Sequence, residues 1–184
     1  MKRVLDIALS VLALVLLAPL FVAVSVAIVV DSSLPVFFRQ PRVGRGGREF
    51  GMLKFRSMSR NAAAVGPYFT GVNDKRITPI GRFIRRTSID ELPQLVNVLC
   101  GEMSLVGPRP DVPVQQSLYR SEDWHRRCMV KPGITGLAQV RGRSQMSFEQ
   151  RLALDLQYAQ NVSIWQDIHI MWQTLRQLGG RNAN

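Results

Sequence analysis

The sequence predicts a mainly α-helical protein of the α+β class, with one small β-hairpin and an N-terminal membrane helix kinked at Pro19. Three patterns predict this fold: a long apolar segment over residues 4–30, two strand-like segments separated by glycines, and several helix-start signals in the last third of the chain. We therefore expect two domains, a re-entrant membrane helix-hairpin over residues 1–31 and a second domain over residues 32–184.

The apolar segment is interrupted by only four residues, Asp6, Ser10, Pro19 and Ser25. As one helix it would be roughly 40 Å long, more than the ~30 Å hydrocarbon core of a bilayer requires. Pro19 lies near its middle, and proline bends a helix because it removes a backbone hydrogen bond. We therefore expect a kink at Ala18-Pro19.

Basic residues flank the apolar segment on both sides, and such residues favour the cytoplasmic face of a membrane. They are Lys2 and Arg3 before it and Arg39, Arg42, Arg45 and Arg48 after it. Both flanks obey this rule if the helix enters and leaves by the same face. A single tilted span, with its N-terminus outside, remains the alternative. Asp6 needs a partner in this setting, and Arg3, about one helical turn away, is the expected one.

The middle of the chain predicts the β-hairpin. Residues 36–40 and 49–55 are short apolar or alternating segments, and the loop between them contains Gly44, Gly46 and Gly47. The segment Lys54-Phe55-Arg56-Ser57-Met58 mixes cations with apolar groups, which suits a membrane surface. Residues 59–76 indicate a polar connection with little regular structure.

Several helices are predicted beyond the hairpin. A short one covers residues 78–86, and the next ends at Gly101, a residue type typical of helix C-termini. Residues 113–127 indicate one or two helices. Helices also begin at Ser147 and Ser163, each followed three residues later by glutamine, and end near residues 160 and 179. Trp165 and Trp172 favour an interfacial position for the last, amphipathic helix.

Asp90 and Glu91 stand side by side, shortly after Arg85 and Arg86. A carboxylate can hold Mg²⁺ or attack phosphorus, and arginines can hold phosphate oxygens. The alternative is structural, because Ser88-x-x-Glu91 has the spacing of a capping box at a helix start. Asp90 is not needed by such a box, so it is the stronger candidate for chemistry.

The formal net charge of +11, from 24 basic and 13 acidic residues, favours anionic partners: nucleic acid, acidic lipid or phosphorylated small molecules. No helix-turn-helix or RNA-binding motif is present, so we expect no nucleic-acid partner. Cys100 and Cys128 lack the spacing of a metal site, and His125 and His169 are isolated. The two cysteines indicate reduced thiols in a cytosolic compartment.

Several long motifs, in the same order along nearly the whole chain, resemble those of bacterial monotopic phosphoglycosyl transferases, the polyprenyl-phosphate sugar-1-phosphate transferases. They are Lys2-Arg3-x-x-Asp6, a proline at the centre of the membrane segment, the Lys54–Met58 segment, residues 88–95, Gly101–Pro110 and Lys131–Gly136. The size of the chain is similar to the minimal catalytic form of this family. One departure is Ala18, where the family often has serine before the proline.

The resemblance implies a reaction. A nucleoside-diphosphate sugar, usually a UDP-sugar, gives its sugar-1-phosphate to polyprenyl (undecaprenyl) phosphate, and UMP is released. It also implies a catalytic domain on the cytoplasmic face of the bacterial inner membrane, membrane lipids and downstream glycosyltransferases as partners, and a role in glycoconjugate or exopolysaccharide biosynthesis.

The resemblance implies roles for individual residues as well. Asp90 would be the nucleophile that forms a covalent phosphosugar intermediate, Glu91 would complete the dyad, and Mg²⁺ would be required, with Asp90 as a ligand. Lys2, Arg3 and Asp6 would anchor the membrane helix. The expected substrate-binding residues are Lys54, Arg56, Arg85, Pro108, Arg109, Pro110, Thr135, Gln139 and Arg141.

Two alternatives stay open from the sequence. In the first, polyprenyl phosphate attacks the donor directly and Asp90 is a metal ligand only. In the second, the protein is a non-enzymatic, membrane-anchored basic module that binds acidic lipid; this explains the charge and the N-terminus but not Asp90-Glu91 among arginines.

Overall fold

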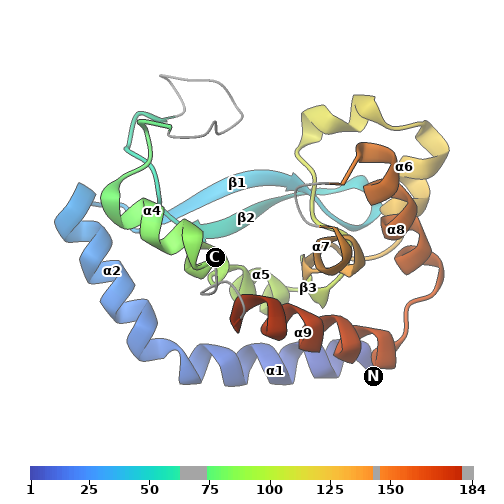
Figure 1. Cartoon of the computed structure of the whole chain (residues 1–184), viewed down its shortest axis with the longest axis horizontal. Coiled ribbons are helices and arrows are strands. Elements are labelled where there is room, and N and C mark those ends of the chain that lie inside the picture. Colours follow the sequence, from blue (N-terminus) through green and yellow to red (C-terminus); the bar gives the residue numbers. More distant parts are fainter. Residues whose placement is uncertain (63–73, 143–145, 180–184) are drawn as a thin grey trace.

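A computed structural model describes residues 1–62, 74–142 and 146–179, and the side chains up to Gln177. The fold is α+β, as predicted, with an angled arm of two helices along one side and the other elements on its inner side (Figure 1). The helices and strands are α1 (Lys2–Leu16), α2 (Ala18–Ser32), β1 (Phe37–Val43), β2 (Glu49–Phe55), α4 (Pro79–Arg86), α5 (Gln94–Cys100), β3 (Ser104–Val106), α6 (Ser121–Arg127), β4 (Gly133–Thr135), α7 (Leu137–Arg141), α8 (Phe148–Gln160) and α9 (Ile164–Gly179).

The arm consists of α1 and α2, which meet at Leu17 with a bend of 61°. Pro19 lies in the first turn of α2, where a missing N–H interrupts no helical hydrogen bond. No single helix among the described residues has the length and apolar composition to cross a bilayer, whereas α1 and α2 meet that test together as a bent pair. The break in the apolar segment is therefore confirmed, and the re-entrant path stays a prediction.

Polar side chains near the start of α1 attach it to the rest of the protein. The buried carboxylate of Asp6 accepts hydrogen bonds from Ser104 Oγ, at 2.9 and 3.1 Å, and from the backbone N–H of Leu105 at 3.1 Å. Arg3 donates instead to two carbonyls at the end of α5. The predicted Asp6–Arg3 pair is therefore wrong, because β3, distant in sequence, supplies the donors that the carboxylate needs.

Lys2 makes a second attachment, to α9 and the strand β3. Its Nζ lies 2.5 Å from the buried carboxylate of Asp167 and 3.1 Å from both the hydroxyl of Tyr158 and the carbonyl of Val106. The hydroxyl of Tyr158 lies within hydrogen-bond distance of both Asp167, at 2.7 Å, and the carbonyl of Val106, at 2.9 Å, and has one proton to donate to them. The beginning of the apolar segment is thus fixed to the strand that leads into residues 107–110.

The predicted β-hairpin is confirmed, with β1 and β2 antiparallel from Phe37↔Phe55 to Val43↔Glu49. The first strand runs three residues further than predicted, past Pro41, which a two-stranded sheet tolerates because each strand has a free edge. Gly46 and Gly47 have positive φ in the loop, as a tight hairpin turn requires. Phe55 packs with Val24 and other apolar side chains of α2 and α4 in a core that joins the arm to the hairpin.

Most of the remaining helices follow their sequence signals. Thr78 caps α4, Gly101 ends α5 at φ 85°, and the capping box of Ser147 and Gln150 begins α8. Residues 113–127 form a 3-10 turn, Pro113–Leu118, followed by α6. Trp165 and Trp172 are exposed on α9, as an interfacial helix needs, although their contact with a membrane stays a prediction. The polar connection expected over 59–76 lies largely outside the described residues.

A parallel two-stranded sheet of β3 and β4, absent from the sequence prediction, forms beside α1, and glycines allow its close packing. The backbone N–H of Gly107 donates to Thr135, and that of Gly133 donates to Pro108. A Cβ at Gly107 would stand 2.3 Å from the carbonyl oxygen of Lys131. The backbone that precedes Pro108 therefore has room only for glycine.

We expect Gly107→Ala to destabilise the fold by about 1–3 kcal/mol, the usual cost of overpacking, because the new methyl group meets backbone atoms that cannot rotate away. The matched control is Gly51→Ala in β2, where the nearest atom to a Cβ is 3.5 Å away on the flexible side chain of Arg39. Thermal unfolding of the two variants checks this, and equal unfolding temperatures would contradict it.

Candidate active site

The two predicted catalytic carboxylates lie on a short 3-10 turn, Ile89–Glu91, between α4 and α5. Ser88 precedes the turn with φ 60°, a left-handed conformation that is rare for a side-chain-bearing residue. Its side chain makes no capping hydrogen bond, so the structural alternative of a Ser88–Glu91 capping box is wrong. The reversal at Ser88 turns Asp90 and Glu91 toward strand β2 and residues 107–110.

Glu91 is held by two cations that come from different parts of the chain. Its Oε1 lies 2.8 Å from Lys54 Nζ on β2 and 2.7 Å from the guanidinium of Arg109. Burial opposes ionisation of Glu91, but the charges of Arg109 and Lys54 outweigh it and lower the pKa of Glu91 to about 2. Glu91 is thus a permanently ionised group that fixes two cations beside Asp90.

Asp90 has the opposite environment. It is 8% exposed, and within residues 1–62, 74–142 and 146–179 its carboxylate accepts no hydrogen bond. Burial raises the pKa of Asp90 to about 6, although the charge of Lys54 opposes this rise. An ionised carboxylate without hydrogen bonds is poorly solvated, and such a group is available to bind a cation or to attack an electrophile.

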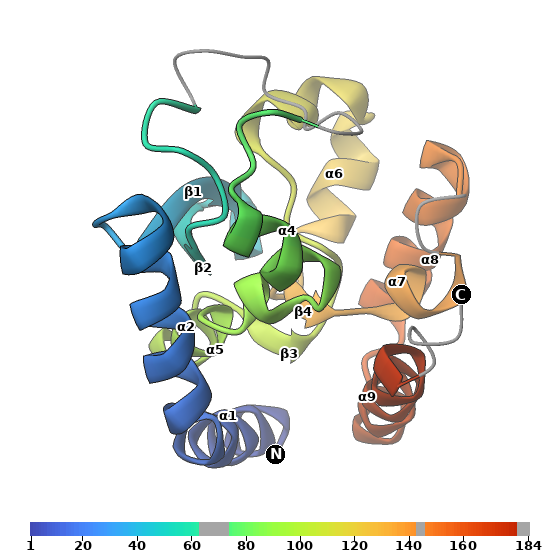
Figure 2. The ribbon, with the colours of Figure 1, turned by 60° about the vertical axis from the view of Figure 1, so that its left-hand side comes forward.

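A cavity of about 930 Å³ opens beside this carboxylate pair, large enough for a small-molecule substrate. Glu91 and Arg109 line it, while Asp90 itself is not among the lining residues. Its other walls come from α1 and α9, which both lie at the base of the molecule in Figure 2, and from α5, α7 and α8. The polar lining residues include Ser88, Glu91, Arg109, Gln139, Arg151 and Asp155, and the apolar ones include Leu9, Ala13, Leu92, Leu95, Leu105, Ile134, Met171 and Leu175.

Of the other predicted substrate-binding residues, some line this cavity and others do not. Thr135 and Gln139 line it; the hydroxyl of Thr135 shares a hydrogen bond with Thr174, at 2.7 Å. The amide oxygen and nitrogen of Gln139 are buried and find no partner among the described residues, so this amide is available to a ligand. Arg141 is exposed at the end of α7 and is not a lining residue.

Arg56 and Arg85, two further predicted substrate-binding residues, donate hydrogen bonds to serine residues of the protein. The buried guanidinium of Arg56 donates to the carbonyls of Ser32 and Ser33 at the end of α2, so it joins the hairpin to the arm. Nε of Arg85 donates to Ser57 Oγ at 2.7 Å, and the charge of Arg85 favours the ionised form of Asp90. Arg85 is thus placed near the carboxylate pair, while Arg56 faces the arm.

Sequence reasoning did not find Arg151 and Asp155, which line the cavity from α8. They stand four residues apart on a helix that the sequence does predict, so their i, i+4 spacing was the only available signal.

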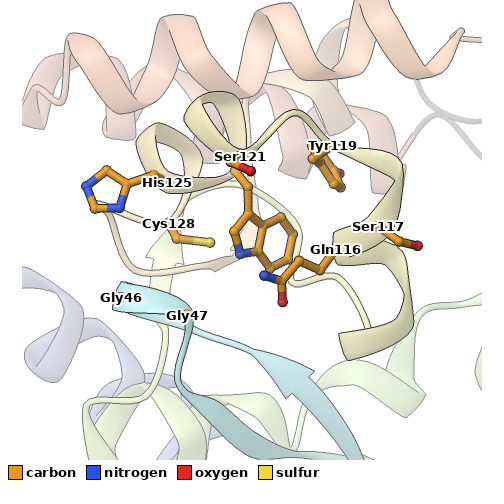
Figure 3. Close-up of a pocket in the computed structure, with 9 residues that line it drawn as sticks. Gly46, Gly47, Gln116, Ser117, Tyr119, Ser121, His125 and Cys128 are labelled. Carbon is orange, nitrogen blue, oxygen red and sulfur yellow. The ribbon is translucent and has the colours of Figure 1, made fainter.

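A second cavity, of about 440 Å³, lies between the hairpin loop and the segment from the Pro113–Leu118 turn to α6. Figure 3 shows His125 and Cys128 at one end of it, with Tyr119 and Ser117 at the other. None of the predicted site residues lines this second cavity.

The magnesium site predicted at Asp90 stays a prediction, and the residues present allow it only if substrate completes the coordination. Among the described residues, no group of three or more His, Cys, Asp or Glu side chains is arranged to hold a metal ion. Mg²⁺, however, is commonly held by one or two carboxylates together with water and substrate phosphates. Asp90, whose carboxylate accepts no hydrogen bond from the described residues, is the side chain that would contribute a ligand.

A family model described as bacterial sugar transferase matches residues 1–181 of the chain. The chain is 47% identical to the undecaprenyl-phosphate glucose phosphotransferase of Komagataeibacter xylinus, over 99% of this chain and 36% of that protein. It is 42% identical to the UDP-glucose:undecaprenyl-phosphate glucose-1-phosphate transferase of Caulobacter vibrioides, over 96% of this chain and 69% of that protein.

A third relative is the undecaprenyl-phosphate galactose phosphotransferase of Salmonella typhimurium, which is 41% identical over 96% of this chain and 40% of that protein. The chain therefore spans 36–69% of the length of these three relatives.

Removing the negative charge of Asp90 and removing that of Glu91 should change the free energy of unfolding in opposite directions. Asp90→Asn should stabilise the protein at pH 7.5 by about 2–3 kcal/mol, because its pKa of about 6 in the folded state, against an ordinary ~3.9, makes the ionised form costly. This difference should shrink as the pH falls from 6 to 4. Glu91→Gln should destabilise by a similar amount at pH 7.5, because the folded protein favours the ionised form at every pH above about 4.

Unfolding of both variants in detergent, followed at pH 4, 5.5 and 7.5, measures the two effects. Destabilisation by Asp90→Asn at pH 7.5 would show that Asp90 is well solvated after all.

Proposed function

Because this chain belongs to the bacterial sugar transferase family, as its sequence motifs predicted, we propose that it transfers a sugar-1-phosphate from a nucleoside-diphosphate sugar to polyprenyl phosphate. The observation that supports this most directly is the carboxylate pair. Glu91 is held by Lys54 and Arg109 and lines a cavity with polar and apolar walls, and the carboxylate of the adjacent Asp90 accepts no hydrogen bond from the part of the chain that the structure describes.

In the first half of the proposed reaction, a carboxylate oxygen of Asp90 attacks the phosphorus that carries the sugar. The bond from that phosphorus to the oxygen bridging the two phosphates breaks, and the nucleoside monophosphate leaves with the bonding electrons. The guanidinium of Arg109 is held by Glu91, and 43% of the side chain is exposed. Its other N–H groups would donate hydrogen bonds to the phosphate that leaves. Phosphoryl transfer depends on such positioning and charge neutralisation.

In the second half, a phosphate oxygen of the polyprenyl phosphate attacks the same phosphorus. The bond to Asp90 breaks, which restores the carboxylate and yields polyprenyl-diphosphate sugar. A covalent intermediate allows a water-soluble donor and a membrane-bound acceptor to use one site in turn. The other mechanism, with direct attack and Asp90 as a metal ligand only, predicts no intermediate bound to protein.

Asp90 would hold Mg²⁺, and the bound ion would supply positive charge for the phosphate that leaves. Lys54 places its ammonium group on Glu91, at 2.8 Å, and forms no ion pair with Asp90 among the described residues, so it does not compete with a cation at Asp90.

The apolar part of the cavity supports a lipid acceptor. Leu9 and Ala13 of α1 form one wall, and Met171 and Leu175 of α9 contribute to another. The other face of α1 is exposed and apolar, with Val15 67% exposed. A helix pair that enters the cytoplasmic leaflet of the bacterial inner membrane and returns would place this cavity at the lipid interface, where the acceptor phosphate lies.

The relatives give reasons to expect an undecaprenyl acceptor, which all three names specify, and a UDP-sugar donor, which the name of the Caulobacter vibrioides relative specifies. They differ in the sugar, glucose in two and galactose in one, so the sugar of this chain stays open. The product would enter a glycoconjugate pathway as its first membrane-bound intermediate.

The test is UMP release from a panel of UDP-sugars, with undecaprenyl phosphate and Mg²⁺, by the wild type and by Asp90→Asn. We expect release with at least one sugar that depends on acceptor and on metal, and a loss of at least about 10³-fold in the variant, because the nucleophile is absent. A radiolabelled sugar-phosphate that stays on the protein when acceptor is omitted would support the covalent mechanism.

Release that is unaffected by Asp90→Asn would contradict the assigned role of Asp90. If no sugar supports release while the protein binds acidic vesicles, the basic lipid-binding module becomes the better explanation.

The acceptor wall generates a separate prediction. Ala13→Phe should raise the KM for undecaprenyl phosphate about 10-fold, because the ring fills the cavity where we place the isoprenoid chain, with little change in the KM for the donor. The matched control is Val11→Phe on an exposed part of the same helix, which should change neither KM. Equal effects of the two substitutions would place the acceptor elsewhere.

A further inference from the structure

The segment that carries Arg109 is fixed by its backbone on all sides. Four consecutive carbonyl oxygens, those of residues 108–111, each accept a hydrogen bond, and the donors come from three elements, β1, β4 and α6. The donors are the backbone N–H groups of Gly133 (2.9 Å, to Pro108) and Val43 (2.8 Å, to Asp111), and the guanidinium groups of Arg127 (2.6 Å, to Arg109) and Arg42 (2.8 Å, to Pro110). Prolines on both sides of Arg109 restrict its dihedral angles further.

Arg127 is the donor that touches Arg109 itself. It lies on α6 with only 4% of its side chain exposed, and it uses three of its nitrogens at once. NH2 donates to the carbonyl of Arg109, Nε to Asp155 at 2.9 Å, and NH1 faces Asp111 at 3.0 Å. One planar guanidinium thus joins α6, α8 and the loop that carries Arg109.

The charges of this buried group are balanced. Asp111 also lies 3.3 Å from Arg151 and accepts a hydrogen bond from the hydroxyl of Tyr119 at 2.5 Å. Two carboxylates therefore face two guanidinium groups, so that none of the charges is left uncompensated in the interior. Arg127 is not among the residues that line either cavity, which excludes direct contact with a substrate there.

We propose that Arg127 is a positioning residue for sugar-phosphate transfer, because it holds the backbone of Arg109 in the place from which the Arg109 guanidinium reaches Glu91. This inference rests on the proposed function, in which Arg109 acts on the nucleotide side of the donor. Lysine cannot replace arginine here, since a single ammonium group cannot present donors in a fixed fork to two carboxylates and a carbonyl.

The test compares Arg127→Lys with Arg126→Gln, a neighbour on α6 that forms an exposed ion pair with Glu122. Arg127→Lys keeps the buried positive charge, so that the carboxylates stay compensated and the chain can fold. We expect a roughly 10-fold rise in the KM for the UDP-sugar, an unchanged KM for undecaprenyl phosphate, and no effect of Arg126→Gln.

The same substitution is then made in an Arg109→Lys background. Once the Arg109 guanidinium is absent, Arg127→Lys should raise the KM for the UDP-sugar no further. Any change that Arg127→Lys makes to the unfolding temperature should be the same in both backgrounds. A purely structural role predicts equal losses in both backgrounds and for both substrates, and that result would overturn the proposal.

A readout that needs no turnover separates this inference from the proposed function. The Nε–H NMR signal of Arg109, assigned by its loss in Arg109→Lys, should be sharp in the wild type and in Arg126→Gln, and broadened in Arg127→Lys. A sharp, unshifted signal in Arg127→Lys would refute the positioning role, even if the protein transfers a different group from the one proposed.

Discussion

The interaction on which the site depends is the double ion pair of Glu91 with Lys54 and Arg109. It joins three segments that are distant in sequence: strand β2, the turn after α4 and the loop after β3. Glu91 takes both cations, and burial of its neighbour Asp90 raises the pKa of that carboxyl, although the charge of Lys54 opposes the rise. The two adjacent carboxylates therefore differ in role because of their environments and not because of their chemistry.

The attachment of α1 follows a related principle. The polar side chains of Lys2, Arg3 and Asp6 are all turned toward the protein, where they contact β3, α5 and α9. Their cost of burial is offset by hydrogen bonds, and the apolar side chains of the same helix remain on its outer face. The helix proposed to enter the membrane also forms one wall of the cavity. It would therefore fix the position of the cavity relative to the membrane surface.

Local features of this fold could be predicted because local signals encode them. The glycine loop of the hairpin, the cap of Thr78 and the capping box of Ser147 each depend on a few neighbouring residues. The partners of Asp6 and Arg127 could not be predicted, since they lie 98 and 28 residues away in sequence. The capping box at Ser88 failed for the same reason: Lys54 and Arg109 are stronger partners for Glu91 than a backbone N–H, and no local pattern reveals them.

The charge balance of the site gives the physical reason to propose a divalent cation. Lys54 and Arg109 compensate Glu91 and an ionised Asp90, so the apo site is close to neutral. The diphosphate of a nucleotide sugar would add about two negative charges next to a carboxylate that is already destabilised by burial. Arg85 is partly engaged by Ser57 and compensates only part of that excess. Asp90 would hold the proposed Mg²⁺, whose two positive charges would restore the balance once the diphosphate is bound.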